Sequence, residues 1–199
     1  MAKRPGSSNT LRLVGGRHGG RKLKFPDAKG LRPTADRTRE TLFNWLAPVI
    51  EGSNCLDLFA GSGALGFEAV SRGAAHVTMV EMALPVFRQL KQNVDLLNET
   101  DHVDIHHLTA RKWLEQAPQL KPGHKTDLEF DVVFLDPPFN ENLLEETMDN
   151  IFRLDLLKPS GFLYVERDIR QKLPELPENC SLIRDKTAGQ VAYSLIECV

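Results

Sequence analysis

Residues 55–81 read CLDLFAGSGALGFEAVSRGAAHVTMVE, and this stretch decides the fold. Its first five residues are apolar around one acid, Asp57, which is typical of a short buried strand in a parallel sheet. The small residues 60–63 predict a tight turn that a ligand can approach closely. A helix is predicted over residues 64–72 and a second strand over residues 76–81. The stretch therefore predicts half of a nucleotide-binding βαβ layer.

The turn and the second strand form a candidate nucleotide site. Backbone N–H groups at residues 61–64 lie at the start of the predicted helix and face the ligand. Glu81 ends the second strand twenty residues after Gly61, and its carboxylate can accept hydrogen bonds from both ribose hydroxyls. Gly61, Gly63 and Gly66 also satisfy the GxGxxG pattern of nicotinamide enzymes. The glycine turn alone therefore does not show whether the cofactor is a nicotinamide dinucleotide or another nucleotide.

The composition bounds the class of protein. The chain has 199 residues, 41% of them hydrophobic, which suits one domain with an appendage. No apolar run is long enough to span a bilayer, and the basic N-terminus lacks the apolar core of a secretory signal, so we expect a cytoplasmic protein with no membrane partner. The three cysteines form no CxxC pair, and their odd, scattered number argues against a disulfide framework. The histidines lack the spacing of metal ligands, so no metal is expected.

Positive charge gathers at the N-terminus. Residues 1–40 hold eleven Lys or Arg and three acids, a net charge of +8, whereas the whole chain carries −2. Two short strands over residues 11–14 and 21–25, joined by a Gly-rich turn, predict a basic hairpin. We interpret residues 1–30 as an RNA-binding arm, although a solvated tail is the plainer reading of basic residues alone. Its candidate phosphate contacts are Arg12, Arg17, Arg21, Lys22 and Lys24.

Strands and helices alternate over residues 31–199, which predicts a doubly wound, mostly parallel, seven-stranded α/β sheet with the hairpin as an N-terminal extension. Thr34 is expected to cap a helix that begins near Ala35 and turns Leu42 and Ile50 toward the core. Further helices are expected over residues 84–98, 109–116 and 143–153. The remaining strands are expected over residues 103–108, 130–135, 162–166, 181–185 and 191–196, the last two as an antiparallel hairpin at the sheet edge.

Polar residues follow several of these strands and should meet at one edge of the sheet, beyond the strand C-termini. They include Asp57, Glu81, Thr109 with Ala110, and the segment Asp136-Pro137-Pro138-Phe139. The two prolines have a fixed φ and no N–H, so they hold the Asp136 carboxylate and the Pro137 carbonyl rigidly. Two fixed acceptors suit one –NH₂ group on a base, and Phe139 offers a face for stacking. The expected reaction is attack of that amine on an electrophilic methyl group, driven by positioning and electrostatics.

The joint pattern resembles S-adenosylmethionine-dependent methyltransferases that act on amino groups. The segments LRLVGGRHGGRKL (residues 11–23) and RPTADRTRETLFNWL (residues 32–46) narrow the resemblance to the RsmD family of bacterial 16S ribosomal RNA guanine-N2 methyltransferases, over nearly the whole chain. The resemblance implies a Rossmann-like fold, S-adenosyl-L-methionine as methyl donor, and guanine 966 of 16S rRNA in assembled small ribosomal subunits as the target. We expect a monomer.

The resemblance also assigns candidate roles. The catalytic residues are Asp136 and the Pro137 carbonyl, which hold the guanine amine, and Phe139, which stacks the base with Pro138 beside it. The cofactor-binding residues are Asp57, Ala60, Gly61, Gly63, Glu81, Thr109 and Ala110. Related enzymes often have Asp-Ala where this chain has Thr109-Ala110, so the contact to the adenine amine is the weakest assignment. Arg32, Thr34 and Arg39 are expected to close over the cofactor.

Three other functions fit parts of the sequence. Asp-Pro-Pro-aromatic segments also serve DNA adenine-N6 methyltransferases, although 199 residues leave no evident target-recognition domain. A nicotinamide-dependent oxidoreductase fits the glycine turn but leaves residues 136–139 unexplained. A non-catalytic RNA-binding assembly factor fits the basic arm alone. In every RNA reading the target base must be unpaired or flipped out of its helix before its amine can be reached.

Overall fold

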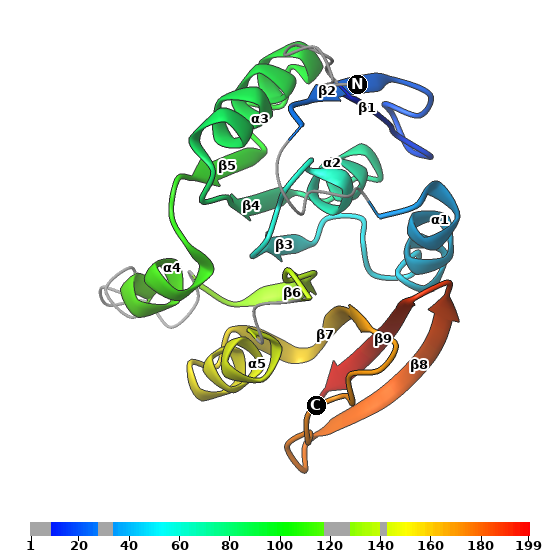
Figure 1. Cartoon of the computed structure of the whole chain (residues 1–199), viewed down its shortest axis with the longest axis vertical. Coiled ribbons are helices and arrows are strands. Elements are labelled where there is room, and N and C mark those ends of the chain that lie inside the picture. Colours follow the sequence, from blue (N-terminus) through cyan, green and yellow to red (C-terminus); the bar gives the residue numbers. More distant parts are fainter. Residues whose placement is uncertain (1–8, 28–33, 118–127, 140–142) are drawn as a thin grey trace, which may run out of the picture.

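The computed structural model describes residues 9–27, 34–117, 128–139 and 143–199. Within them, a seven-stranded sheet has the order β5-β4-β3-β6-β7-β9-β8 (Figure 1). Neighbours are parallel from β5 to β7, whereas β9 and β8 continue the sheet as an antiparallel edge hairpin. The predicted sheet is confirmed. Its strands are β3 (Asn54–Asp57), β4 (His76–Val80), β5 (Val103–His106), β6 (Phe130–Leu135), β7 (Leu157–Asp168), β8 (Cys180–Ala188) and β9 (Val191–Cys198).

Helices cover both faces of this sheet, as a doubly wound fold requires. Successive residues of a strand point to opposite faces, and accordingly Cys55 and Leu56 of β3 belong to different hydrophobic clusters. Helices α1, α2 and α3 pack in the first cluster, and α4 and α5 pack in the second. Their bounds are α1 (Asp36–Trp45), α2 (Ala64–Ser71), α3 (Leu84–Leu97), α4 (Ala110–Gln116) and α5 (Leu144–Arg153).

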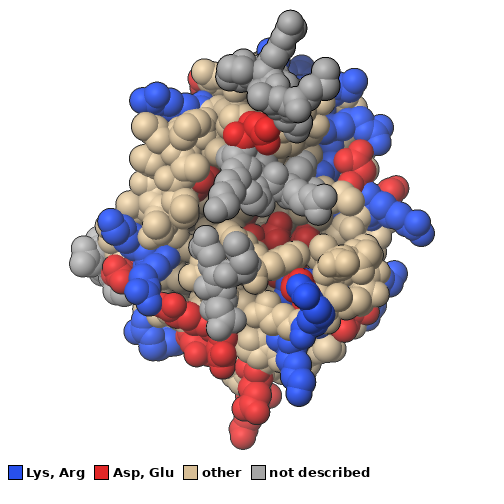
Figure 2. Space-filling model, viewed as in Figure 1, with Lys and Arg blue, Asp and Glu red and all other residues tan. Residues whose placement is uncertain are grey.

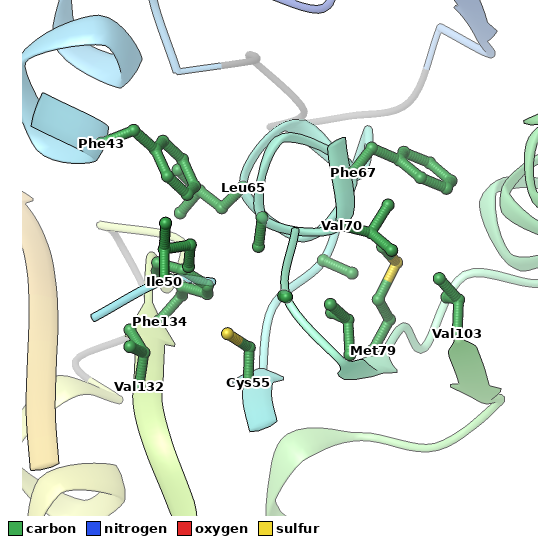
Figure 3. Close-up of a cluster of buried hydrophobic side chains, with 14 of the residues drawn as sticks. Phe43, Ile50, Cys55, Leu65, Phe67, Val70, Met79, Val103, Val132 and Phe134 are labelled. Atoms are coloured by element: carbon green, nitrogen blue, oxygen red, sulfur yellow. The ribbon is translucent and has the colours of Figure 1, made fainter. Parts of the chain in front are cut away.

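The first cluster fixes α1 and α2 against the sheet (Figure 3). The rings of Phe43 on α1 and Phe134 on β6 lie 5.9 Å apart. Helix α2 approaches β4 so closely that a Cβ on Gly66 would lie 2.4 Å from the Met79 methyl group. Gly66 therefore serves close packing of helix on strand, and this packing sets where α2 begins beside the end of β3.

Helix α1 differs from its predicted form. Its N-cap is Ala35 without a side-chain hydrogen bond, so the prediction that Thr34 caps the helix is wrong. The helix also ends at Trp45, and Ile50 reaches the core from the following turn, where its N–H donates to the Leu46 carbonyl. The side chain of Thr34 is therefore free to serve the cavity described below.

The N-terminal strands β1 (Asn9–Arg12) and β2 (Lys22–Phe25) form the predicted hairpin as a separate two-stranded sheet, beside α2 and α3 (Figure 1). Strand β1 begins two residues earlier than predicted. The hairpin is anchored to the body, because its leucines are buried and the backbone N–H groups of Val14 and Gly15 each donate to the Glu68 carboxylate at 2.8 Å.

A second acid anchors the turn of the hairpin. Glu99, only 4% exposed, follows α3 and accepts a hydrogen bond from Arg17 Nη2 at 2.9 Å. The ring of His18 meets the other carboxylate oxygen at 2.5 Å. The turn is therefore fixed to the body by polar contacts as well as by apolar packing.

Cys180 and Cys198 form a disulfide, contrary to the prediction from the cysteine count. The two residues stand directly opposite each other where β8 pairs with β9, with Cα atoms 4.1 Å apart. The count of cysteines carries no information about this register. The third cysteine, Cys55, is buried and free, and burial raises the pKa of its thiol to about 12. None of the described helices has the length and apolar character to cross a membrane.

Candidate active site

A cavity of about 1140 Å³ opens at the C-terminal ends of the parallel strands. Acidic side chains are visible in a hollow near the centre of this face (Figure 2). Its walls bring together nearly all the predicted catalytic and cofactor-binding residues, from the ends of β3, β4 and β6 and the start of α4. Those that line it are Asp57, Ala60, Gly61, Glu81, Thr109, Ala110, Asp136, Pro137, Pro138 and Phe139.

Gly63 lies just outside the lining and shapes the turn. It is the N-cap of α2 in the left-handed region, at φ 79°. A Cβ there would lie 2.4 Å from the Phe67 ring. Only glycine fits this backbone without strain. The turn therefore brings the start of α2 and its free N–H groups to the cavity.

Glu81 bridges the two loops that border this side of the cavity. One carboxylate oxygen accepts the Gly61 N–H at 3.0 Å, and the other accepts the Ala83 N–H at 2.6 Å. Burial raises the pKa of Glu81, and these N–H groups partly offset that rise. Each oxygen keeps a second lone pair, so the side chain fits the predicted role of accepting from two ribose hydroxyls.

Asp57 lies beneath the turn, 1% exposed. One of its oxygens accepts the Gly66 N–H at 3.1 Å, and the other has no hydrogen-bond partner among the described residues. Burial raises the pKa of Asp57 to about 7, against the lowering effect of that N–H. The hydrogen bond therefore joins the end of β3 to the first turn of α2.

The segment from Asp136 to Phe139 faces the glycine turn from the end of β6. Burial raises the pKa of Asp136 well above its usual range, and the nearby carboxyls of Glu166 and Asp57 raise it further. Phe139 is 40% exposed at the cavity rim. Such a side chain can stack on a planar ring, as the sequence predicts.

The cavity is acidic. Of the described residues that line it, Arg111 is the only basic one, and it pairs with Glu146. No group of three described His, Cys, Asp or Glu residues is arranged to hold a metal ion. A cationic ligand such as a sulfonium suits this donor set. The acidic residues of the lining are Asp57, Glu81, Asp136, Glu146, Glu166 and Asp168.

Some predicted contacts lie elsewhere. Arg39 is fully buried behind the cavity and donates to the backbone carbonyls of Thr34 and Arg12, so it does not close over a ligand. Arg32 falls outside the described residues. Thr109 lines the cavity, but its hydroxyl caps α4 by accepting the Lys112 N–H at 3.2 Å.

The basic residues of the hairpin lie away from the cavity lining. Three of the five have partners: Arg12 pairs with Asp36, Arg17 with Glu99, and Arg21 donates to the Leu96 carbonyl. Lys22 and Lys24 are exposed on β2. Only part of the predicted positive charge is therefore free of internal contacts.

Sequence reasoning missed Glu166 as a site residue. Glu166 is 4% exposed and follows an apolar run of β7. The pattern of an apolar strand with an acid near its end also marks Glu81, so this signal was present in the sequence. Thr34, which the resemblance assigns to the cofactor site, lines the same cavity from the segment before α1.

The fold and the cavity define a Rossmann-like methyltransferase of class I. A solved structure from Escherichia coli superposes with a TM-score of 0.83 at 44% identity, covering 96% of this chain and 98% of that chain. A solved structure from Haemophilus influenzae superposes with a TM-score of 0.79 at 40% identity, covering 96% of this chain and 99% of that chain.

Sequence comparison gives the family. Residues 11–197 match the model of a family described as conserved hypothetical protein 95. The chain is 45% identical to ribosomal RNA small subunit methyltransferase D of Escherichia coli K12, covering 98% of this chain and 94% of that protein. The chain is 43% identical to the Haemophilus influenzae protein of the same name, and the match covers 97% of this chain and 96% of that protein. The chain belongs to the ribosomal RNA small subunit methyltransferase D family, known as RsmD, as its sequence motifs predict.

Proposed function

We propose that this protein transfers a methyl group from S-adenosyl-L-methionine to the exocyclic N2 amine of a guanine in 16S rRNA of the small ribosomal subunit. The observation that carries the proposal is the placement of residues 136–139 on the wall of the cavity that the glycine turn and Glu81 also line. Relatives that cover nearly the whole chain are named small subunit rRNA methyltransferases. Guanine-N2 as the acceptor, guanine 966 as the nucleotide, action in the cytoplasm and a monomeric enzyme belong to the same proposal.

The cofactor is assigned to the half of the cavity below the glycine turn. Glu81 would accept the ribose hydroxyls, and the backbone at residues 60–63 would border the chain that carries the sulfonium. When bound, S-adenosylmethionine supplies an electrophilic methyl group. The acidic lining favours a cation there, because opposite charges attract strongly where water is excluded.

The Asp136 segment is assigned to the acceptor base. An exocyclic amine is a weak nucleophile because its lone pair is delocalised into the ring. Asp136 and the Pro137 carbonyl would accept its two N–H bonds, which holds the nitrogen in place and favours the form with an available lone pair. Phe139 would stack on the base. The attacking nitrogen sheds a proton after methylation, so a strong base is not required at the outset.

RNA is assigned to the surface of the hairpin. Lys22 and Lys24 are exposed on β2, and Arg12 and Arg17 keep about half of their side chains exposed despite their ion pairs. Phosphate contacts through such residues weaken as salt rises. Deletion of residues 1–25 would also remove the groups that donate hydrogen bonds to Glu68 and Glu99 in the body of the protein. A double variant, Lys22→Ala with Lys24→Ala, therefore tests the RNA contact without disturbing this anchoring.

The test is methyl transfer from radiolabelled S-adenosylmethionine to small subunits isolated from a strain that lacks the protein, followed by nucleoside analysis and mapping of the product. N2-methylguanosine at one position is expected. Labelled N6-methyladenosine on DNA, with no transfer to subunits, would replace the proposal by the DNA adenine-N6 alternative. Binding of NADH in preference to S-adenosylhomocysteine would support the oxidoreductase alternative.

Asp136→Ala should bind S-adenosylhomocysteine with unchanged affinity and lose methyl transfer, because Asp136 is assigned to the base. Asp104→Ala is the matched control: this acid on β5 is 67% exposed and lies outside the cavity lining, so its variant should keep full transfer. Near-normal turnover by Asp136→Ala would remove this residue from the mechanism.

A further inference from the structure

A second carboxyl group stands beside Asp136 at the end of the neighbouring strand. Strands β6 and β7 are parallel, with Leu135 opposite Val165 as their last paired residues. The next residue of each strand is an acid, Asp136 on one and Glu166 on the other. Residues at the same level of adjacent parallel strands point to the same face. Both side chains line the cavity.

The surroundings of Glu166 hold it in one position. The hydroxyl of Tyr164, two residues earlier on the same face of β7, donates to Glu166 Oε1 at 2.8 Å. The Thr34 side chain lines the cavity beside both acids, and its hydroxyl lowers the pKa of Glu166 and of Asp136. Among the described residues, Glu166 forms no salt bridge.

The fold itself gains little from such an acid. A buried carboxylate without a paired cation is costly, and the cost is tolerated mostly where the group has a task. A threonine or an alanine at this position would leave the β6–β7 ladder intact. The candidate task is therefore to be sought in the cavity, where Glu166 lies next to the residue assigned to the substrate amine.

We propose that Glu166 accepts a hydrogen bond from N1–H of the target guanine and so determines which base is methylated. This inference rests on the proposed function, since it requires a base whose amine is held by Asp136. The Watson–Crick edge of guanine presents two neighbouring donors, N1–H and the N2 amine. Two carboxyl side chains side by side match that pair of donors.

The same arrangement rejects adenine. The amine of adenine adjoins N1, which carries a lone pair and no hydrogen. An ionised Glu166 has no donor for that lone pair, so two acceptors would face each other inside the cavity. Sites built to bind a substrate N–H discriminate strongly against analogues that lack it, because the buried protein group is left unpaired.

The charge of the pair favours Glu166 as the ionised member. Burial raises the pKa of Glu166, but hydrogen bonds from Tyr164 and Thr34 and the positive charge of Arg39 lower it. For Asp136, the Thr34 side chain alone lowers the pKa against burial and two neighbouring carboxyls. Burial therefore raises the pKa of both acids, whereas the lowering contributions from Tyr164 and Arg39 act on Glu166.

The experiment separates N1 from the amine by using 2-aminopurine, which keeps the 2-amine but has a lone pair at N1. Small subunits are reconstituted with guanine or 2-aminopurine at the methylated position, which the nucleoside mapping identifies. Single-turnover methyl transfer is then measured for the wild type and for Glu166→Gln. In the variant, the Tyr164 hydroxyl would hold the amide oxygen and turn the amide –NH₂ toward the base.

The wild type should prefer guanine by about 10- to 100-fold, the range of one hydrogen bond to a charged group. Glu166→Gln should reduce that preference by at least about tenfold, because its amide can donate to N1 of 2-aminopurine. The two bases also differ at position 6, where guanine has an oxygen and 2-aminopurine a hydrogen. Both enzymes meet this difference, so it cancels when the guanine preference of the wild type is divided by that of the variant. Glu146→Gln, which removes one charge from the same lining, should keep the wild-type ratio.

Each outcome is decisive. No transfer by the wild type to guanine-containing subunits refutes the proposed function. Transfer to guanine with an unchanged preference in Glu166→Gln keeps that function and refutes the role of Glu166. Equal loss with both bases also refutes it, because a structural role lowers both rates together. Should Glu166→Gln fail to bind S-adenosylhomocysteine, Glu166→Ala takes its place in the same comparison and should likewise reduce the preference for guanine. Equal wild-type rates with guanine and 2-aminopurine exclude recognition at N1 in either case.

Discussion

Replacing Asp57 by asparagine measures what the buried carboxyl beneath the glycine turn costs the folded protein. The side chain is 1% exposed, and burial raises its pKa to about 7. An ordinary aspartate in an unfolded chain has a pKa of about 3.9. The folded state therefore binds a proton to Asp57 more tightly than the unfolded state does. By linkage, its contribution to stability rises as the pH falls below about 7 and is lost as the pH rises through that value.

The magnitude follows from the pKa. Each pH unit below the folded pKa and above the unfolded one is worth about 1.36 kcal/mol. From about pH 7 down to about pH 5, Asp57 thus adds about 2.7 kcal/mol to the free energy of unfolding. Asparagine keeps an oxygen for the Gly66 N–H and never titrates. We expect Asp57→Asn to be more stable than the wild type at about pH 8 and to lose that advantage toward about pH 5.

The assay is urea unfolding of both proteins at several pH values across this range, with Asp104→Asn as a control for an exposed acid. Other buried acids of the cavity titrate in both proteins, so the difference between wild type and variant isolates Asp57. If the two proteins show the same dependence of unfolding free energy on pH, Asp57 does not titrate with a raised pKa and the reasoning is refuted. A variant that is less stable at every pH would instead show that the carboxylate is worth more than its burial costs.

Three further predictions concern other parts of the molecule. Glu99→Ala removes the buried acceptor of Arg17 and should lower the free energy of unfolding by about 1–3 kcal/mol; unchanged urea unfolding would contradict the anchoring of the hairpin turn. Gly63→Ala forces a Cβ against the Phe67 ring at positive φ and should lower the melting temperature and weaken S-adenosylhomocysteine binding; a variant that matches the wild type in both would contradict it. The raised pKa of Asp136 means that its ionised form is lost at a higher pH than for an ordinary aspartate, so single-turnover methyl transfer should rise with pH above the range in which an ordinary aspartate titrates, and a flat profile would contradict this assignment.

Local patterns predicted most of the fold. Apolar strands that alternate with amphipathic helices, a glycine turn and an acid at a strand end are short-range features, and the sheet, both helix layers and the positions of Asp57, Glu81 and Asp136 followed from them. The predicted ends of helices were less accurate where contacts with distant parts of the chain determine where a helix begins or ends. The segment at Thr34 is an example, since Thr34 lines the cavity beside carboxyls far along the chain rather than capping α1.

The parts that the sequence did not predict depend on contacts between distant residues. The disulfide requires the exact pairing of β8 with β9, which no count of cysteines contains. The sequence overestimated how much of the hairpin's positive charge is available to bind RNA. Its arginines pair with residues that lie 24 to 82 positions further along the chain. Glu166 was missed because its significance comes from the strand beside it, and strand order is a property of the sheet as a whole.

The acidic lining of the cavity has a consequence for how a nucleic acid strand can approach it. Of the described residues that line the cavity, six are acids and one, Arg111, is basic and already paired with Glu146. The acids that are ionised repel a phosphate group, whereas a neutral base is not repelled. The entrance therefore acts as an electrostatic filter that keeps the backbone of a strand outside and admits only the flat, uncharged part of a nucleotide. How deeply a base enters is then limited by where its own phosphates must stop.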